Sequence, residues 1–261
     1  MTTFLDQKKA INRIFLTLFV TVFALSLLSS NSVKGQQSIN DYVIRAEQDV
    51  NLGSSNTITG IIGAGSSVSA ESSTFIDGDI YVDGTVSLSG ATVTGTVYQT
   101  PLPITLPILP PLSQSEAGGI DITSTQTINP GSHGSIQISS NNNTITFNGP
   151  GVYKFQSIEI TANNTDFIFD FNSQPGDIII YVHGDMNVGK SSASLKANGG
   201  GAANRILTEI RGNGSSNGYA FSMDNGNGGK GSKWLGTVLA PYGSIKFGSG
   251  TGSSNITGAL L

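Results

Sequence analysis

Short apolar segments separated by Gly, Ser, Asn and Asp follow one another along the chain from residue 38 onward. Each is three to five residues long and alternates apolar with polar positions, as in 85–88, 135–138 and 158–160. A period of two is typical of β-strands with one buried face. Helix signals are nearly absent, because the nearest candidate, 195–211, is interrupted by glycines at 199–201. We therefore predict an all-β protein.

The segments also repeat at a nearly fixed distance. An apolar–polar–Gly–any–apolar pattern surrounds Gly60, Gly78 and Gly95, which lie 18 and then 17 residues apart, and it returns at 182–186, 234–238 and 256–260. A fixed short period is typical of solenoids, in which each repeat is one coil stacked on the next. Strands this short bury their apolar rows only when the coils stack. The pattern predicts a β-solenoid (parallel β-helix) of short coils, with Gly and Asn at the corners.

A proline-rich stretch divides the repeats. Residues 100–112 contain five prolines, which cannot donate to a strand ladder. We expect an N-terminal solenoid over 38–99, an extended connector over 100–119, and a longer C-terminal solenoid over 120–261. The Leu and Ile content of the connector favours a strap lying on apolar surface, and the alternative is a docking motif for an aromatic groove.

The first 35 residues have the pattern of an export signal. A basic region with Lys8, Lys9 and Arg13 precedes an apolar run at 14–28 and small residues up to Gly35. This order predicts a cleaved signal peptide over 1–35, the alternative being an uncleaved membrane anchor. We expect no transmembrane segment after signal removal. The protein is therefore expected to be secreted, extracellular or attached to the cell surface.

Composition excludes several classes of function. With no cysteine, thiolate metal sites, cysteine nucleophiles and disulfide scaffolds are excluded. Cleavage after Gly35 removes four of 13 basic and one of 17 acidic residues, which leaves 9 against 16 and a net charge of −7. Nucleic-acid binding needs clustered Lys and Arg, so we expect none.

Four pieces of the C-terminal region suggest a family. A Gly-x-Tyr piece at 149–155, a buried strand ending in Gly-Asp at 176–188, Gly-Thr-x-x-Ala-Pro at 236–241 and 256–260 occur in this order. The set resembles choice-of-anchor-A type bacterial surface proteins, related to ice-binding-like β-solenoid domains, over about residues 128–261. The resemblance implies a secreted or cell-surface solenoid without catalytic residues. The apolar end at 256–261 departs from this pattern, because a solenoid needs a terminal cap. Either the chain is a fragment or something else covers the final coil.

Acidic residues supply the first candidate site. Asp77, Asp79 and Asp83 form the densest acidic cluster and offer carboxylate oxygens to Ca²⁺. No Asp-rich repeat continues it, so we favour solvent-facing residues, with no metal and no cofactor. The other carboxylates are scattered and form no acid/base pair. The chain is therefore predicted not to be an enzyme, the alternative being a polysaccharide-active β-helix enzyme.

Two further candidates involve surface side chains. Outward threonines in rows suggest an ice-binding alternative, and these are Thr92, Thr94, Thr96, Thr123, Thr125 and Thr127. Aromatic rings that stack on sugars suggest a ligand site at Tyr219 and Trp234. The phenylalanines at 147, 155, 167, 169 and 171 are expected in the core. We predict a non-catalytic structural or adhesive solenoid of a bacterium that contacts extracellular polysaccharide or cell-surface components. The oligomeric state is not readable.

Overall fold

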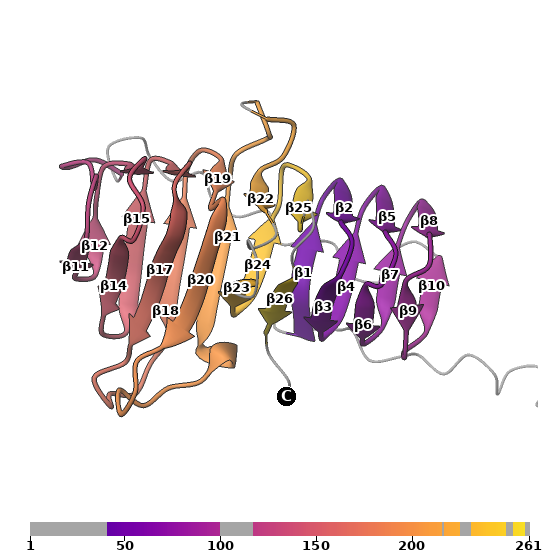
Figure 1. Ribbon diagram of the computed structural model, residues 1–261, viewed down its shortest axis with the longest axis horizontal. Helices are drawn as coiled ribbons and strands as arrows, with labels where there is room; N and C mark the ends of the chain where they lie inside the picture. The colour runs from indigo at the N-terminus through magenta and orange to yellow at the C-terminus, as the bar shows by residue number, and fades with distance from the viewer. Residues whose placement is uncertain (1–40, 100–116, 216, 225–230, 249–252, 259–261) are drawn as a thin grey trace, which may run out of the picture. The chain divides into compact units, whose positions relative to one another are not determined.

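The computed structural model describes residues 41–99, 117–215, 217–224, 231–248 and 253–258, and their regular secondary structure is almost entirely β-strand (Figure 1). Within these ranges, 26 strands form three parallel sheets of nine, nine and eight strands. Each coil contributes one strand to each sheet, in the order sheet A, sheet B, sheet C, so the described chain is a parallel β-solenoid as predicted. The signal peptide expected over 1–35 and residues 100–116 of the connector lie outside the described residues.

The strands of each wall follow one another at the spacing of one coil. Sheet A contains β1 (Tyr42–Ala46), β4 (Ile61–Ala64), β7 (Ile80–Val82), β10 (Val97–Gln99), β12 (Gly131–Ser132), β15 (Gly151–Phe155), β18 (Ile178–Val182), β21 (Ile206–Ile210) and β24 (Thr237–Ala240). Sheet B contains β2 (Asp49–Leu52), β5 (Ser67–Ala70), β8 (Thr85–Leu88), β13 (Ile136–Ile138), β16 (Ile158–Ile160), β19 (Met186–Asn187), β22 (Phe221–Met223) and β25 (Ile245–Phe247). Sheet C contains β3 (Asn56–Thr59), β6 (Phe75–Asp77), β9 (Thr92–Val93), β11 (Gln126–Ile128), β14 (Thr144–Asn148), β17 (Asn163–Asp170), β20 (Lys190–Leu195), β23 (Ser232–Leu235) and β26 (Ser254–Thr257). A 3₁₀ turn, η3 (Ala203–Arg205), precedes β21.

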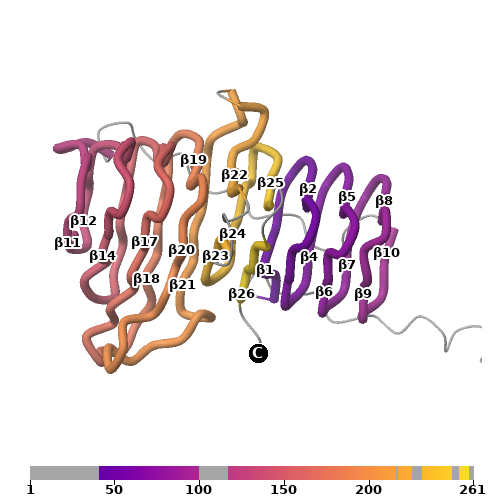
Figure 2. The backbone as a smooth tube through the Cα atoms, in the orientation of Figure 1, coloured from indigo at the N-terminus to yellow at the C-terminus, as the bar shows by residue number. Residues whose placement is uncertain are grey.

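The first coil of the chain stacks directly on the last. Strand β1 pairs with β24, β2 with β25 and β3 with β26, all parallel and in register. In the tube drawing, the indigo first coil lies beside the yellow last coil, and the two segments extend away from this seam (Figure 2). We call this contact the seam. It makes residues 38–261 one compact unit.

The seam joins the segments expected over 38–99 and 120–261 to each other. The expected segments do correspond to β1–β10 and β11–β26, but their three sheets are continuous. The final coil is covered by β1–β3, which is the second of the two explanations considered for its apolar end. Edge strands of a parallel sheet present unpaired N–H and C=O groups, and pairing across the seam satisfies them.

Apolar columns fill the space between the walls. One column of sheet B runs in register through Ile136, Ile158, Met186, Phe221, Ile245, Val50, Val68 and Val86. The phenylalanines at 147, 155, 167, 169 and 171 are fully buried, as expected. Stacking therefore removes from water the apolar rows that a single short strand leaves exposed. This burial stabilises the folded state by about 25 cal/mol for each Å² of apolar surface.

The repeating glycines and asparagines lie at corners of the coil. A Cβ on Gly78 would lie 2.2 Å from the Gly60 carbonyl oxygen, and a Cβ on Gly95 would lie 2.4 Å from the Gly78 carbonyl oxygen. This close stacking explains the 18- and 17-residue spacing. Asn142 and Asn164 have φ of 62° and 59°, a left-handed conformation that Asn tolerates.

Candidate functional site

A row of polar side chains crosses the seam on the outward face of sheet B. Lys246 of β25 lies in register with Asn51 of β2, which lies in register with Ser69 of β5. The Ser69 hydroxyl donates a hydrogen bond to Asn51 Oδ1 at 2.7 Å. Alternation turns these side chains outward while Val50 and Leu52 point into the core. The row therefore joins residues from opposite ends of the sequence.

A hollow of about 340 Å³ lies over this row. We call it the seam hollow, and it is lined by Asn51, Leu52, Gly53, Ser69, Glu71, Tyr219, Lys246 and Gly248. Tyr219 comes from the loop before β22 and is half-buried. The Lys246 Nζ lies 5.6 Å from the centre of its ring, within the range of a cation–π contact. These contacts place the Tyr219 ring over the polar row of Asn51, Ser69 and Lys246.

The chemistry of the seam hollow suits a polyhydroxylated ligand. An aromatic ring offers a surface for the apolar C–H face of a sugar ring. Asn51, Ser69 and Lys246 supply amide, hydroxyl and ammonium groups for hydrogen bonds to sugar hydroxyls. The Glu71 carboxylate accepts a hydrogen bond from Ser54 at 2.9 Å, and its remaining lone pairs can accept from a hydroxyl. The arrangement has the features of a carbohydrate-binding surface.

Sequence reasoning finds only one residue of the seam hollow. The sequence predicts Tyr219 as a ligand contact, and the structure places its side chain in the lining. Asn51, Ser69, Glu71 and Lys246 are missed, because their proximity depends on the seam pairing and not on sequence spacing.

The expectation that Trp234 contacts a ligand is wrong. The Trp234 side chain is completely buried, and its ring lies 5.4 Å from Phe167 and 6.2 Å from Phe221, centre to centre, in edge-to-face contacts. The residue occupies an inward position of β23, where alternation points its large ring into the core. Its position just after the glycine-rich sequence 212–232 suggests exposure, but the alternation of β23 turns the ring inward.

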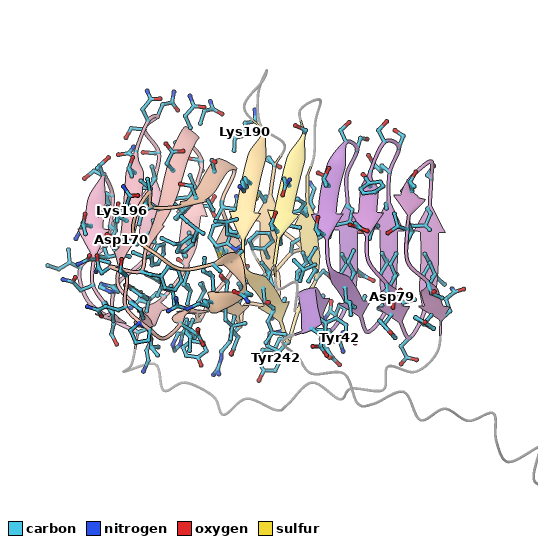
Figure 3. The ribbon with its side chains drawn as sticks, turned by 90° about the horizontal axis from the view of Figure 1, so that it is seen from below. Tyr42, Asp79, Asp170, Lys190, Lys196 and Tyr242 are labelled. Atoms are coloured by element: carbon cyan, nitrogen blue, oxygen red, sulfur yellow. The ribbon has the colours of Figure 1, made fainter. Side chains whose placement is uncertain are left out.

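The acidic cluster serves coil stacking in the structure. Asp77 Oδ1 accepts a hydrogen bond from the Thr94 hydroxyl at 2.7 Å, and Asp79 Oδ1 accepts one from the Thr96 backbone N–H at 2.7 Å. Both bonds join one coil to the next. Figure 3 places Asp79 among the N-terminal coils. Asp83 is exposed at the following corner. Across the ranges that the structure describes, no three His, Asp or Glu side chains gather into a set that could hold a metal ion.

The six threonines of the ice-binding alternative lie at opposite ends of the solenoid. Thr92, Thr94 and Thr96 belong to β9 and the residues after it, and Thr123, Thr125 and Thr127 lie in β11 and just before it, while β9 and β11 are the two edges of sheet C. The outward rows between them carry Asp166, Lys233, Phe75 and Asp77. The threonines therefore share one sheet but not one continuous surface.

Two ion pairs have structural roles: one joins adjacent coils, and the other lies at the end of β21. Lys196 Nζ lies 2.6 Å from Asp170 Oδ2, joining adjacent coils (Figure 3). The hydrogen bond from Lys196 lowers the pKa of Asp170 below its usual range. Burial raises the pKa of Glu209, which accepts a hydrogen bond from Arg211 Nε at 2.6 Å. Each of these two acids pairs with a basic side chain, so its position is accounted for by a structural ion pair.

Comparison with known proteins returns no match among protein families, curated proteins or solved structures. The fold is therefore established by the strands alone, and the resemblance to choice-of-anchor-A proteins stays a prediction. Within the described part of the chain, no helix has the length and hydropathy needed to cross a bilayer.

Proposed function

We propose that this chain is a non-catalytic, secreted or cell-surface β-solenoid that adheres to extracellular polysaccharide through the seam hollow. The observation that supports the proposal best is the position of Tyr219, whose ring lies beside Lys246 above the polar row of sheet B. Stacked coils supply a rigid frame, which is what a binding surface needs to hold its contacts in place. The export signal predicted over 1–35 supports the location.

Binding to a glycan array by the secreted chain tests this proposal. We expect retention on a subset of polysaccharides and at least about tenfold weaker binding by Tyr219→Ala, which corresponds to about 1.4 kcal/mol. Lys246→Gln is expected to weaken binding in the same direction, because it removes the ammonium donor beside the ring. Tyr242→Ala is the matched control, since Tyr242 is 44% exposed and does not line the hollow.

The result that contradicts the proposal is equally specific. Absence of glycan binding by the intact chain, or equal loss of binding in Tyr219→Ala and Tyr242→Ala, rules out the seam hollow as the adhesive site. Each variant is first compared with the parent by the emission of Trp234, the single tryptophan, so that a folding defect is not read as lost binding.

The geometry favours the ice-binding alternative less. A few threonines are in register, such as Thr127 with Thr146 and Thr257 with Thr59. Charged and aromatic side chains interrupt both rows between the edges of sheet C. A thermal-hysteresis measurement on residues 36–261 distinguishes the two proposals, and activity there would favour ice over glycan. Release of reducing or unsaturated sugars from the same glycan panel would instead favour the enzyme alternative.

A further inference from the structure

The two ends of the solenoid differ in how their inward side chains are covered. The coil of β8, β9 and β10 ends the described stack on one side, and the coil of β11, β12 and β13 ends it on the other (Figure 1). We call the first of these the open end. A coil at the end of a stack has a neighbouring coil on one side only, so the exposure of its inward residues reports how well it is covered.

The inward side chains of the open end are partly exposed. Val97 of β10 is 36% exposed, whereas Ile80, its register partner in the preceding coil, is fully buried. Val93 of β9 is half-buried, while its register partner Ile76 is fully buried. The apolar columns of the core therefore reach the surface at this end.

At the opposite end, a described segment covers the last coil. Ile136 of β13 and Ile128 of β11 point inward and are buried. Ile122 forms a parallel bridge with Ile136, its N–H donates to the Ser135 carbonyl at 2.8 Å, and its own carbonyl accepts from the Gln137 N–H at 2.8 Å. No described segment pairs in this way with the free side of β8, β9 or β10.

The open end also lacks the side chains that commonly keep sheet edges apart. Residues 84–99 contain no Asp, Glu, Lys, Arg or Pro, although residues 41–83 contain eight charged residues. The three strand pairs that end the stack here run in unbroken register. Charged side chains, proline and bulges are among the devices that prevent an edge strand from pairing with another chain. The last coil carries none of these three.

The backbone of the open end is arranged to accept a further strand. The N–H groups of Thr92 and Thr94 donate to the carbonyls of Thr74 and Ile76 in the preceding coil, at 2.8 and 3.0 Å. Successive residues of a strand direct their backbone groups to opposite sides, so the N–H and C=O groups of Val93 point away from the stack. An edge of this kind is a template for pairing.

We propose that the open end binds the open end of a second copy of this chain, related to the first by a two-fold axis perpendicular to the solenoid axis. This rotation reverses strand direction, so the edge strands of the two copies pair antiparallel and the exposed valines of both copies pack together. The same patch contacts itself, so the assembly closes at two copies and does not grow into a filament.

Two observations favour a second copy as the occupant. The open end carries no charge, so facing it with itself brings no like charges together. The seam also shows that coils of this chain stack through all three walls when they are not neighbours in the sequence. The inference does not depend on the glycan site.

The mass of the secreted chain as a function of concentration, measured by sedimentation equilibrium, tests this proposal. We expect a rise from one to two copies and no larger species. Val97→Lys places a charge opposite its own copy in the interface and should weaken the dimer at least about tenfold. Ile120→Lys is the matched control, because Ile120 is 89% exposed and belongs to the segment that covers the opposite end, and it should leave the dimer unchanged.

Val93→Pro is a second variant in case Val97→Lys fails to fold. Proline removes an N–H that faces the free edge, a position where sheets tolerate it, and it should weaken the dimer in the same direction. In the parent chain, hydrogen exchange of the Val93 amide should slow as the concentration rises.

Three results overturn the proposal: a chain that stays monomeric from micromolar to millimolar concentration, species larger than two copies, or equal weakening of the dimer by Ile120→Lys. Emission of Trp234 reports in each case that the solenoid is folded.

Discussion

Ile44 of β1 lies in register with Val238 of β24, directly beside it in sheet A, although nearly the whole described sequence separates the two residues. The next residues continue the pairing, with Arg45 beside Leu239 and Ala46 beside Ala240. A solenoid that grows coil by coil has no such contact between its first and last coils. The chain therefore begins at the seam, winds away from it as far as β10, and then winds back to it from the opposite end through β11 to β26. The seam hollow exists because this order places β2 beside β25.

A circular permutant is expected to fold into the same solenoid. Gly258 lies beside Val43, since a Cβ on Gly258 would come within 2.3 Å of Val43 Cγ2. A short Gly-Ser linker from the C-terminus to residue 38, with new termini at Ser113 and Leu112, converts the winding into one continuous spiral. Far-UV circular dichroism should be unchanged and the Tm should stay within about 4 °C, a shift worth about 1 kcal/mol. A permutant without cooperative unfolding would contradict the seam.

Gly78→Ala is expected to destabilise the solenoid by about 1–3 kcal/mol, the usual cost of forcing atoms into a packed site. The added Cβ would lie 2.2 Å from the Gly60 carbonyl oxygen, so one coil must move away from the next. Gly118→Ala is the control, because nothing lies within 4 Å of its Cβ position. Chemical denaturation of both variants measures the difference, and equal midpoints would show that the glycine repeat does not set coil spacing.

Trp234→Ala should cost about 3–5 kcal/mol, the range for removing a large aromatic side chain from a core. The ring contacts Phe167, Phe169 and Phe221, and no described group accepts a hydrogen bond from its Nε1. The parent protein should therefore emit at the short wavelengths of a buried indole and shift to longer ones on unfolding. A loss under about 1 kcal/mol, as for exposed Tyr242→Ala, would show that Trp234 is not in the core.

Acid is expected to weaken the contact between Asp170 and Lys196. The pKa of Asp170 is lowered in the folded protein, so its contribution to stability is fully present above the ordinary pKa of 3.8. That contribution disappears as the pH falls through the lower folded-state value. Asp170→Asn should reduce stability at pH 7 and flatten the decline below about pH 4. Asp166→Asn, an exposed acid on the same strand, is the control, and identical pH profiles for both variants would refute this role.

The sequence is sufficient to predict the coil and not its winding. Period-two segments and the repeat at Gly60, Gly78 and Gly95 report local contacts between adjacent coils, which are close in sequence. The pairing of Asn51 with Lys246 leaves no comparable signal, because any coil of matching width can stack on any other. The same limit explains why the sequence points to Tyr219 and not to its neighbours in the seam hollow.

Exposure is harder to predict than strand position. Tyr219 lies within the glycine-rich sequence 212–232 and Trp234 directly follows it, yet Trp234 is buried in β23 and Tyr219 lines the seam hollow over sheet B. Whether a ring points inward depends on its position in a strand, and Trp234 takes an inward position because β23 begins at Ser232. Asp77 and Asp79 resemble a cation site in the sequence, but their hydrogen bonds to Thr94 and Thr96 in the next coil give them a stacking role.

The seam is tested most directly by the dipolar interaction between nitroxide labels on Thr57→Cys and Asn255→Cys, which are outward neighbours in register on β3 and β26. Adjacent strands lie about 4.8 Å apart, so the labels should broaden each other's spectrum strongly in the folded protein and lose the effect on unfolding. Unbroadened spectra from a folded double variant would mean that residues 38–99 and 120–261 form two separate solenoids with no seam between them.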